Sequence, residues 1–178
     1  LATQSLFHIE VNMLSIRQIE NADQVAAAKV LVRGYFEWFF ALVPGSETDP
    51  TFRGWEDELE TIPGRFIPPT GRFLLAEVDG RVAGCIVLKP VSSDTCELKR
   101  LFVLPSCRGK AIGQKLVKAF LVEARVSGYK HAVLDSHVSM TGAHAIYMQS
   151  GFVVVSAPDD FPEELKSSVI FMRRDLES

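Results

Sequence analysis

The sequence has few cysteines, and their spacing forms no pair. The sequence has three cysteines, Cys85, Cys96 and Cys107, and each lies 11 positions from the next. Zinc sites and disulfide frameworks need cysteines at paired spacings. The pattern therefore argues against both kinds of site, and free thiols favour the reducing cytoplasm as the location.

The chain also lacks an excess of positive charge and a long uninterrupted hydrophobic run. Its formal net charge is −3, which does not favour broad attraction to nucleic acid. The longest apolar stretch, residues 25–43, is interrupted by Lys29, Arg33 and Glu37, which share one helical face. That pattern indicates an amphipathic helix and not a membrane span. We therefore expect neither a nucleic-acid partner nor a membrane partner.

No linker, internal repeat or low-complexity tract divides the sequence. With 178 residues, 47% of them hydrophobic, the chain is long enough to bury one sizeable core. Residues 13–178 are predicted to form a single domain. Residues 1–12 lack the basic segment and the continuous apolar core of a secretory signal. We interpret them as an N-terminal extension or a cloning remnant, with Met13 as a natural start.

Hydrophobic periodicity and turn residues predict an alternation of strands and helices. Asn21 or Asp23 is expected to cap the first helix, and Asp79-Gly80 predicts a tight hairpin. We expect strands at 14–18, 73–78, 81–88, 95–103, 131–135, 152–156 and 169–173, and helices at 25–43, 55–60, 110–127 and 141–150. The succession of strand, helix and strand over 95–135 predicts one parallel pair. The fold class is therefore α/β (α+β mixed): a mixed, mostly antiparallel sheet with helices on both faces.

The stretch ELKRLFVLPSCRGKAIG, residues 97–113, has the character of a phosphate site. An apolar strand breaks at Pro105 and leads into a basic, glycine-bearing helix start. Main-chain N–H groups at a helix N-terminus are unpaired and carry partial positive charge, to which Arg108 and Lys110 add full charges. A phosphate-bearing ligand fits this junction.

Two motifs then point to a family. RGKAIG, residues 108–113, resembles the Q/R-x-x-G-x-G/A pyrophosphate signature of the GNAT superfamily (GCN5-related N-acetyltransferases). AHAIYMQSGF, residues 143–152, resembles the later A-x-x-L-Y-x-x-x-G-F element of the same superfamily. Ala111 departs from the signature at its first glycine, and we interpret it as compatible with helical backbone geometry. A nucleoside-triphosphate P-loop is the competing interpretation. That motif requires G-x-x-x-x-G-K-[ST], but Gln114 and Lys115 follow Gly113, so the hydroxyl that would bind magnesium is missing.

The resemblance implies a GNAT-like fold that uses acetyl-CoA as co-substrate and needs no metal. In the family, two central strands separate and the pantetheine arm lies between them. The implied cofactor-binding residues are Leu101, Phe102 and Val103 for the pantetheine and Arg108, Gly109, Lys110, Ala111, Ile112, Gly113 and Gln114 for the pyrophosphate.

The resemblance also implies two catalytic residues. Tyr147, in the second motif, is expected to protonate the leaving thiolate. The alternative interpretation of Tyr147 is a purely structural one, as a half-buried core tyrosine. Glu97 corresponds to the position of a glutamate base in some GNAT enzymes, and its alternative is an ion pair with Lys99 or Arg100. His137, or water, is a further candidate for the base. His144 is interpreted as a surface residue.

The acceptor is less defined than the donor. Segments 46–71 and 156–168 are expected to frame it, and both are rich in acidic residues. Such a field attracts a cationic amine, although a solvated acidic face explains the same pattern. The predicted activity is an acetyl-CoA-dependent N-acetyltransferase acting on a primary amine by direct attack in a ternary complex. The alternative is a non-catalytic acyl-CoA-binding or regulatory module, and a homodimer stays open in either case.

Overall fold

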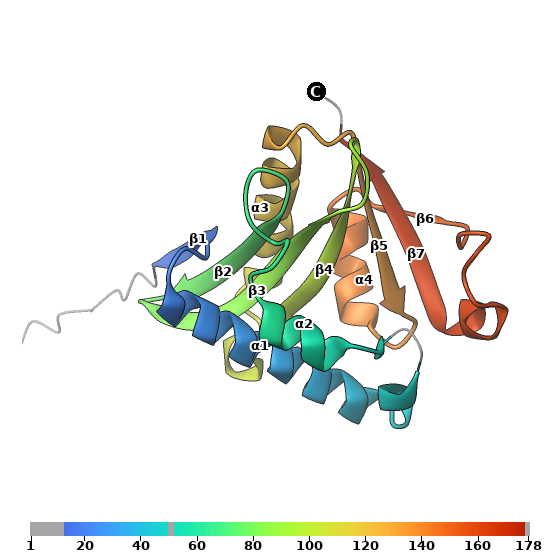
Figure 1. Cartoon of the computed structure of the whole chain (residues 1–178), viewed down its shortest axis with the longest axis horizontal. Helices are drawn as coiled ribbons and strands as arrows, with labels where there is room; N and C mark the ends of the chain where they lie inside the picture. The colour runs from blue at the N-terminus through green and yellow to red at the C-terminus, as the bar shows by residue number, and fades with distance from the viewer. Residues whose placement is uncertain (1–12, 50–51, 177–178) are drawn as a thin grey trace, which may run out of the picture.

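A computed structural model describes residues 13–49 and 52–176, and the predicted extension at 1–12 lies outside them (Figure 1). The strands are β1 (Leu14–Gln18), β2 (Arg72–Val78), β3 (Arg81–Pro90), β4 (Thr95–Val103), β5 (His131–His137), β6 (Val153–Val155) and β7 (Val169–Asp175). The α-helices are α1 (Ala22–Leu42), α2 (Trp55–Thr61), α3 (Ile112–Val126) and α4 (Thr141–Gln149). Short 3₁₀ helices are η1 (Ser46–Thr48), η3 (Pro105–Cys107) and η4 (Glu163–Ser168).

The strands form one sheet in the order β1-β2-β3-β4-β5-β7-β6. β4 and β5 are parallel, and the other neighbouring pairs are antiparallel. Helix α3 connects the parallel pair, as the succession of strand, helix and strand predicts. The predicted fold class, a mixed and mostly antiparallel sheet, is confirmed.

Helices cover both faces of the sheet (Figure 1). Alternation along β2 divides the core, because Phe73 and Leu75 pack with α1 and α2 while Leu74 packs with α3 and α4. α3 contributes Leu116 and Phe120, both fully buried, at the four-residue spacing seen in the sequence. In the described part of the chain, no helix is long and apolar enough to cross a membrane.

Helix α1 begins three residues before the predicted start, because a capping box defines its end. The side chain of Asn21 accepts a hydrogen bond from the Gln24 amide, and the Gln24 side chain accepts one from the Asn21 amide. The hydrophobic pattern alone did not reveal this first turn. The opposite end of α1 carries Tyr35, Trp38 and Phe39 over the sheet, where they line a cavity.

The Asp79-Gly80 hairpin is present between β2 and β3. Asp79 has φ 51° and Gly80 has φ 74°, the two positive values that a tight two-residue turn requires. The turn fixes the register of β3, which in turn pairs with β4 along most of its length.

Strands β4 and β5 separate after a short parallel ladder. Their pairing begins at Thr95↔His131 and ends at Glu97↔Val133, although β4 continues to Val103. Arg100 has φ 54° and lies where the β3–β4 register shifts, which marks a β-bulge. The bulge bends β4 away from β5, and among residues 13–49 and 52–176 no strand pairs with the edge of β4 beyond it on that side.

Candidate active site

A cavity of about 600 Å³ lies beside this separated end of β4. Of the residues predicted to bind the cofactor, Leu101, Phe102, Val103, Arg108, Gly109, Ala111, Ile112, Gly113 and Gln114 line it. Lys110 is exposed and is not part of the lining. Residues 139–143 and the face of α4 with Ala145, Ile146 and Gln149 form the opposite wall.

The edge of β4 offers main-chain groups to this cavity. The Leu104 amide donates to the Ala83 carbonyl at 2.9 Å, so alternation turns the main-chain groups of Val103 away from β3. The Val103 carbonyl accepts a hydrogen bond from Arg108 Nε at 3.1 Å. Phe102 pairs with Cys85 on β3, so its backbone faces β3, and its ring forms part of the cavity wall.

The N-terminus of α3 adds unpaired donors at one end of the cavity. In the part of the chain that the structure describes, no side chain makes a capping hydrogen bond to this helix. Its first hydrogen bond in sequence runs from the Lys115 amide to the Ala111 carbonyl at 3.2 Å. The amides of Ile112, Gly113 and Gln114 therefore have no acceptor within the helix. These donors and the helix dipole suit a diphosphate.

Ala111 explains why glycine is usual at this position. Its φ is 56°, in the left-handed region. The expectation that Ala111 keeps ordinary right-handed helical geometry is therefore wrong. A left-handed conformation costs a non-glycine residue about 1 kcal/mol. The loop therefore adopts this conformation although Ala111 disfavours it.

Replacing Ala111 with glycine is expected to raise the free energy of unfolding by about 1 kcal/mol and to leave the affinity for CoA equal or higher. Urea denaturation measures the first quantity and calorimetry the second. A glycine variant less stable than the parent, or weaker in CoA binding, would contradict the assignment of strain to this residue.

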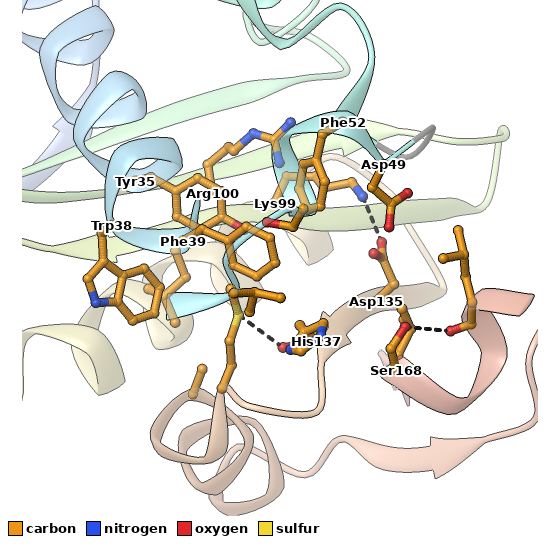
Figure 2. Close-up of a pocket in the computed structure, with 18 of the residues that line it drawn as sticks. Tyr35, Trp38, Phe39, Asp49, Phe52, Lys99, Arg100, Asp135, His137 and Ser168 are labelled. Carbon is orange, nitrogen blue, oxygen red and sulfur yellow. Dashed lines mark hydrogen bonds and ion pairs between the residues drawn. The ribbon is translucent and has the colours of Figure 1, made fainter. Parts of the chain in front are cut away.

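A second cavity, of about 540 Å³, shares lining residues with the first. Figure 2 shows this second cavity in close-up. Aromatic side chains of α1 and Phe52 form one side, and Lys99, Arg100, Asp135 and His137 lie around the rest. Trp38, Leu101, Met140 and Ala143 line both cavities. A chemical group bound beside these four residues would therefore be in contact with ligands in both cavities.

Tyr147 lies on the wall of this second cavity. Its side chain is more deeply buried than a half-buried core tyrosine, with 6% of the residue exposed, and the ring packs against Phe152. Burial raises the pKa of the Tyr147 phenol far above its ordinary value. The hydroxyl therefore stays protonated at neutral pH.

Glu97 is held in an ion-pair network. Its carboxylate lies 3.0 Å from Lys89 Nζ and 2.8 Å from Lys99 Nζ, and the residue does not line either cavity. The ion pair that the sequence left open is therefore present. The base role of Glu97 stays a prediction, and this carboxylate reaches the cavity wall through Lys99 and through a hydrogen bond with Asp135.

The charges that line the second cavity are of both signs. Lys99 donates to Asp135 at 2.7 Å. Burial alone would raise the pKa of Asp135, but the charge and hydrogen bond of Lys99 lower it below its ordinary value. Segments 46–71 and 156–168 both contribute lining residues, yet Asp49 is the one acidic side chain from either that lines the cavity. The lining is therefore less acidic than the two segments suggest.

Arg100 joins this wall to α2. Its guanidinium makes two hydrogen bonds of 2.8 Å with the Glu58 carboxylate and lies 4.6 Å from the centre of the Phe36 ring. A bidentate pair that is mostly removed from water fixes both side chains. The pair thus holds α2 against the bulge of β4.

Replacing Glu58 with alanine is expected to lower the free energy of unfolding by about 3 kcal/mol, because Arg100 would keep a buried charge without its partner. Glu60→Ala on the same helix is the control. The Glu60 side chain is 79% exposed and lies 3.8 Å from Lys29, so its removal should cost less than about 0.5 kcal/mol. Equal losses in guanidinium denaturation would contradict the structural role of the Arg100 pair.

The two histidines near the cavities differ from each other. His137 lines the second cavity, its Nδ1 accepts from the Ser139 amide at 3.2 Å, and burial lowers its pKa. The interpretation of His144 as a surface residue is wrong, because only 7% of it is exposed. Its Nε2 lies 2.9 Å from Ser136 Oγ, and Ser136 lines the cavity. Sequence reasoning did not single out Ser136 or Met140.

A mixed sheet whose parallel strands separate above an uncapped helix start matches the arrangement that the resemblance implies for an acetyltransferase. The model of the Acetyltransferase (GNAT) family matches residues 32–152, and the chain belongs to this family.

Individual relatives agree with the family model. An uncharacterized N-acetyltransferase of Schizosaccharomyces pombe is 28% identical over 92% of this chain and 95% of its own length. The uncharacterized N-acetyltransferase YjgM of Escherichia coli is 28% identical over 77% of this chain and 80% of its own length. Among solved structures, the PaiA N-acetyltransferase of Thermoplasma acidophilum, in complex with coenzyme A, has a TM-score of 0.71 at 21% identity and covers 92% of this chain and 99% of its own. The last comparison shows the fold.

Proposed function

We propose that this protein transfers the acetyl group of acetyl-CoA to a primary amine by direct attack in a ternary complex. The observation that carries the proposal is the pair of cavities that meet at Trp38, Leu101, Met140 and Ala143. One has donors for a diphosphate and the other has mixed polar and aromatic walls. A thioester at the shared residues would be within reach of an amine held in the second cavity.

The first cavity has the groups that acetyl-CoA needs. The amides of Ile112, Gly113 and Gln114, which have no acceptor within the helix, suit the pyrophosphate. The edge of β4 at Leu101 and at the Val103 amide suits the amide groups of the pantetheine arm, while the Val103 carbonyl accepts from Arg108. The coenzyme A complex of the Thermoplasma relative supports the same donor.

The second cavity has the groups that an amine acceptor needs. Tyr35, Phe39 and Phe52 provide apolar surface for its body, and Asp135 stays ionised to attract its ammonium group. An acetylation by this route needs the loss of one ammonium proton before the nitrogen attacks. The C–N bond then forms, the C–S bond breaks, the nitrogen loses its second proton, and the thiolate of CoA takes up one proton.

Tyr147 is proposed as the donor of that last proton. Its phenol stays protonated because its pKa is raised, and its residue lines the cavity next to Ala143, which lines both. Because the raised pKa makes this phenol a weak acid, it donates to the sulfur in concert with uptake of the second proton that the nitrogen loses.

The test is the release of free CoA thiol from acetyl-CoA in the presence of a panel of primary amines, with both substrate concentrations varied. Initial rates that depend on the amine and give intersecting double-reciprocal lines are expected for a ternary complex. Saturable acetyl-CoA binding without acceleration by any amine would favour the non-catalytic acyl-CoA-binding module. Parallel lines would instead indicate an acyl-enzyme.

A further inference from the structure

We propose that Ser136 and His144 form a relay that accepts the proton of the acceptor ammonium. The inference rests on the proposed function, because it assigns a step of that reaction. In the family-derived prediction the base was Glu97, His137 or water. The buried pair of a serine and a histidine lies beside the junction of the two cavities and has no other assigned role.

The geometry of the pair suits proton transfer. Ser136, at the end of β5, lines the acceptor cavity, and its Oγ lies 2.9 Å from His144 Nε2 on α4. The same hydroxyl is also placed to donate to Met140 Sδ at 3.4 Å, a weak acceptor beside the closer Nε2, and Met140 lines both cavities. The serine oxygen is therefore close to the region where the amine and the thioester would meet.

The hydrogen bonds of His144 favour one tautomer. The ring has a backbone hydrogen bond with His137 that raises the pKa of His144, as a bond donated by a ring N–H does. With that proton on Nδ1, the neutral ring presents the lone pair of Nε2 to the serine hydroxyl. The relay then moves an ammonium proton to Ser136 Oγ while the hydroxyl proton passes to Nε2, which leaves a neutral amine and an imidazolium.

The surroundings keep His144 neutral before the reaction. Burial lowers its pKa, and this effect exceeds the opposite effect of the backbone bond. The charge of His137 also lowers the pKa of His144. The other titratable side chains on the cavity that Ser136 lines are Tyr35, Asp49, Lys99, Arg100, Asp135 and Tyr147. On β7, the residues opposite Ser136 and His137 are Ile170 and Val169, which are uncharged. Between α3 and α4, Gly113 faces Ile146, so this contact adds no charge either.

The depressed pKa also resets the relay. An imidazolium in this site is a stronger acid than ordinary histidine, so it returns its proton through Ser136 once the product has left the cavity. His137 is less suited to the step, because its Nδ1 already accepts the Ser139 amide. Glu97 is less suited because two lysines engage its carboxylate.

The kinetic test compares His144→Gln, Ser136→Ala and the double variant, with 2-phenylethylamine, spermidine and L-phenylalanine as acceptor probes. Each single variant is expected to lose about 100-fold or more in kcat/KM for the fastest probe near pH 7, because a positioned base contributes roughly 100- to 10,000-fold. The double variant should lose no more than the singles, since the two residues act as a unit. The acid limb of the wild-type pH profile should disappear, while the KM for acetyl-CoA changes less than about two-fold.

His131→Gln is the matched control, because His131 is on the same strand but pairs with Asp175 outside both cavities. It should keep the wild-type rate and profile. Single variants at Ser136 and His144 that retain wild-type kcat/KM and the acid limb would overturn the relay. Melting temperatures identify any variant whose loss reflects unfolding, and Ser136→Ala, the smaller change, then decides.

A histidine NMR titration separates failure of the relay from failure of the proposed function, because it needs no acceptor. We expect a neutral His144 ring at pH 7 with its proton on Nδ1, and a changed His144 pKa in Ser136→Ala. A charged ring, or a pKa unaffected by Ser136→Ala, overturns the relay whatever the kinetics. If the NMR result is as expected but none of the three amines is acetylated, the hydrogen-bonded pair stands and the amine-transfer function fails.

Discussion

Replacing Gly113 with glutamate is expected to weaken the binding of acetyl-CoA and of CoA by at least about 100-fold. Gly113 contributes one of the three unpaired amides at the start of α3 and lines the cofactor cavity. A β-carbon added there would lie 3.0 Å from Ile146 Cδ1 and 4.0 Å from Val103 Cγ2. The new side chain therefore has to extend toward the space of the diphosphate, where its negative charge repels the ligand.

Two control variants separate charge from bulk. Gly113→Ala adds only the methyl group, which the flexible end of Ile146 can accommodate, so its affinity should fall by no more than about ten-fold. Val122→Glu adds the same charge on the same helix, at a position that is 49% exposed and outside this cavity, and should bind normally. Normal CoA affinity in Gly113→Glu, measured by calorimetry, would contradict the position of the diphosphate site.

Replacing Tyr147 with phenylalanine is expected to lower kcat by about 100-fold or more while the affinity for acetyl-CoA changes little. The ring and its contact with Phe152 remain, and only the hydroxyl that is to protonate the thiolate is lost. The loss should be smallest for acyl donors whose leaving thiol is most acidic, because such a thiolate needs the proton least.

Tyr129→Phe is the control for Tyr147→Phe. Tyr129 is equally buried, but its hydroxyl donates to the Thr70 carbonyl at 2.8 Å and lies outside both cavities. Its removal should cost about 1 kcal/mol of stability and leave kcat unchanged. If Tyr147→Phe behaves in the same way, with unaltered turnover, Tyr147 has only a structural role.

Local signals in the sequence were enough to predict most of the fold. The Asp79-Gly80 turn, the apolar period of α3 and Gly128 after it, with φ 85°, each depend on a few neighbouring residues and were interpreted correctly. The start of α3 was predicted at Lys110 but lies at Ile112, because Ala111 adopts a left-handed conformation before it. Nothing local predicts that conformation for an alanine.

The cofactor side of the site was more predictable than the acceptor side. The residues predicted to bind the cofactor belong to one continuous stretch, residues 101–114, and all of them except Lys110 line one cavity. The acceptor cavity combines α1, Phe52, β4, β5 and α4, and its contacts join distant residues, as in the pair of Arg100 with Glu58. The burial of His144 likewise depends on the packing of α4 against β5, which the short helix does not encode in its own pattern.

The most direct test of the central claim is a calorimetric titration of the protein with acetyl-CoA, repeated with CoA and with ATP. The account predicts saturable binding to one site for both thiol cofactors and none for ATP, because the cavity combines a diphosphate site with a free strand edge for the pantetheine arm. Absence of acetyl-CoA binding would contradict the account. Equal binding of ATP would reduce the site to a phosphate-binding loop.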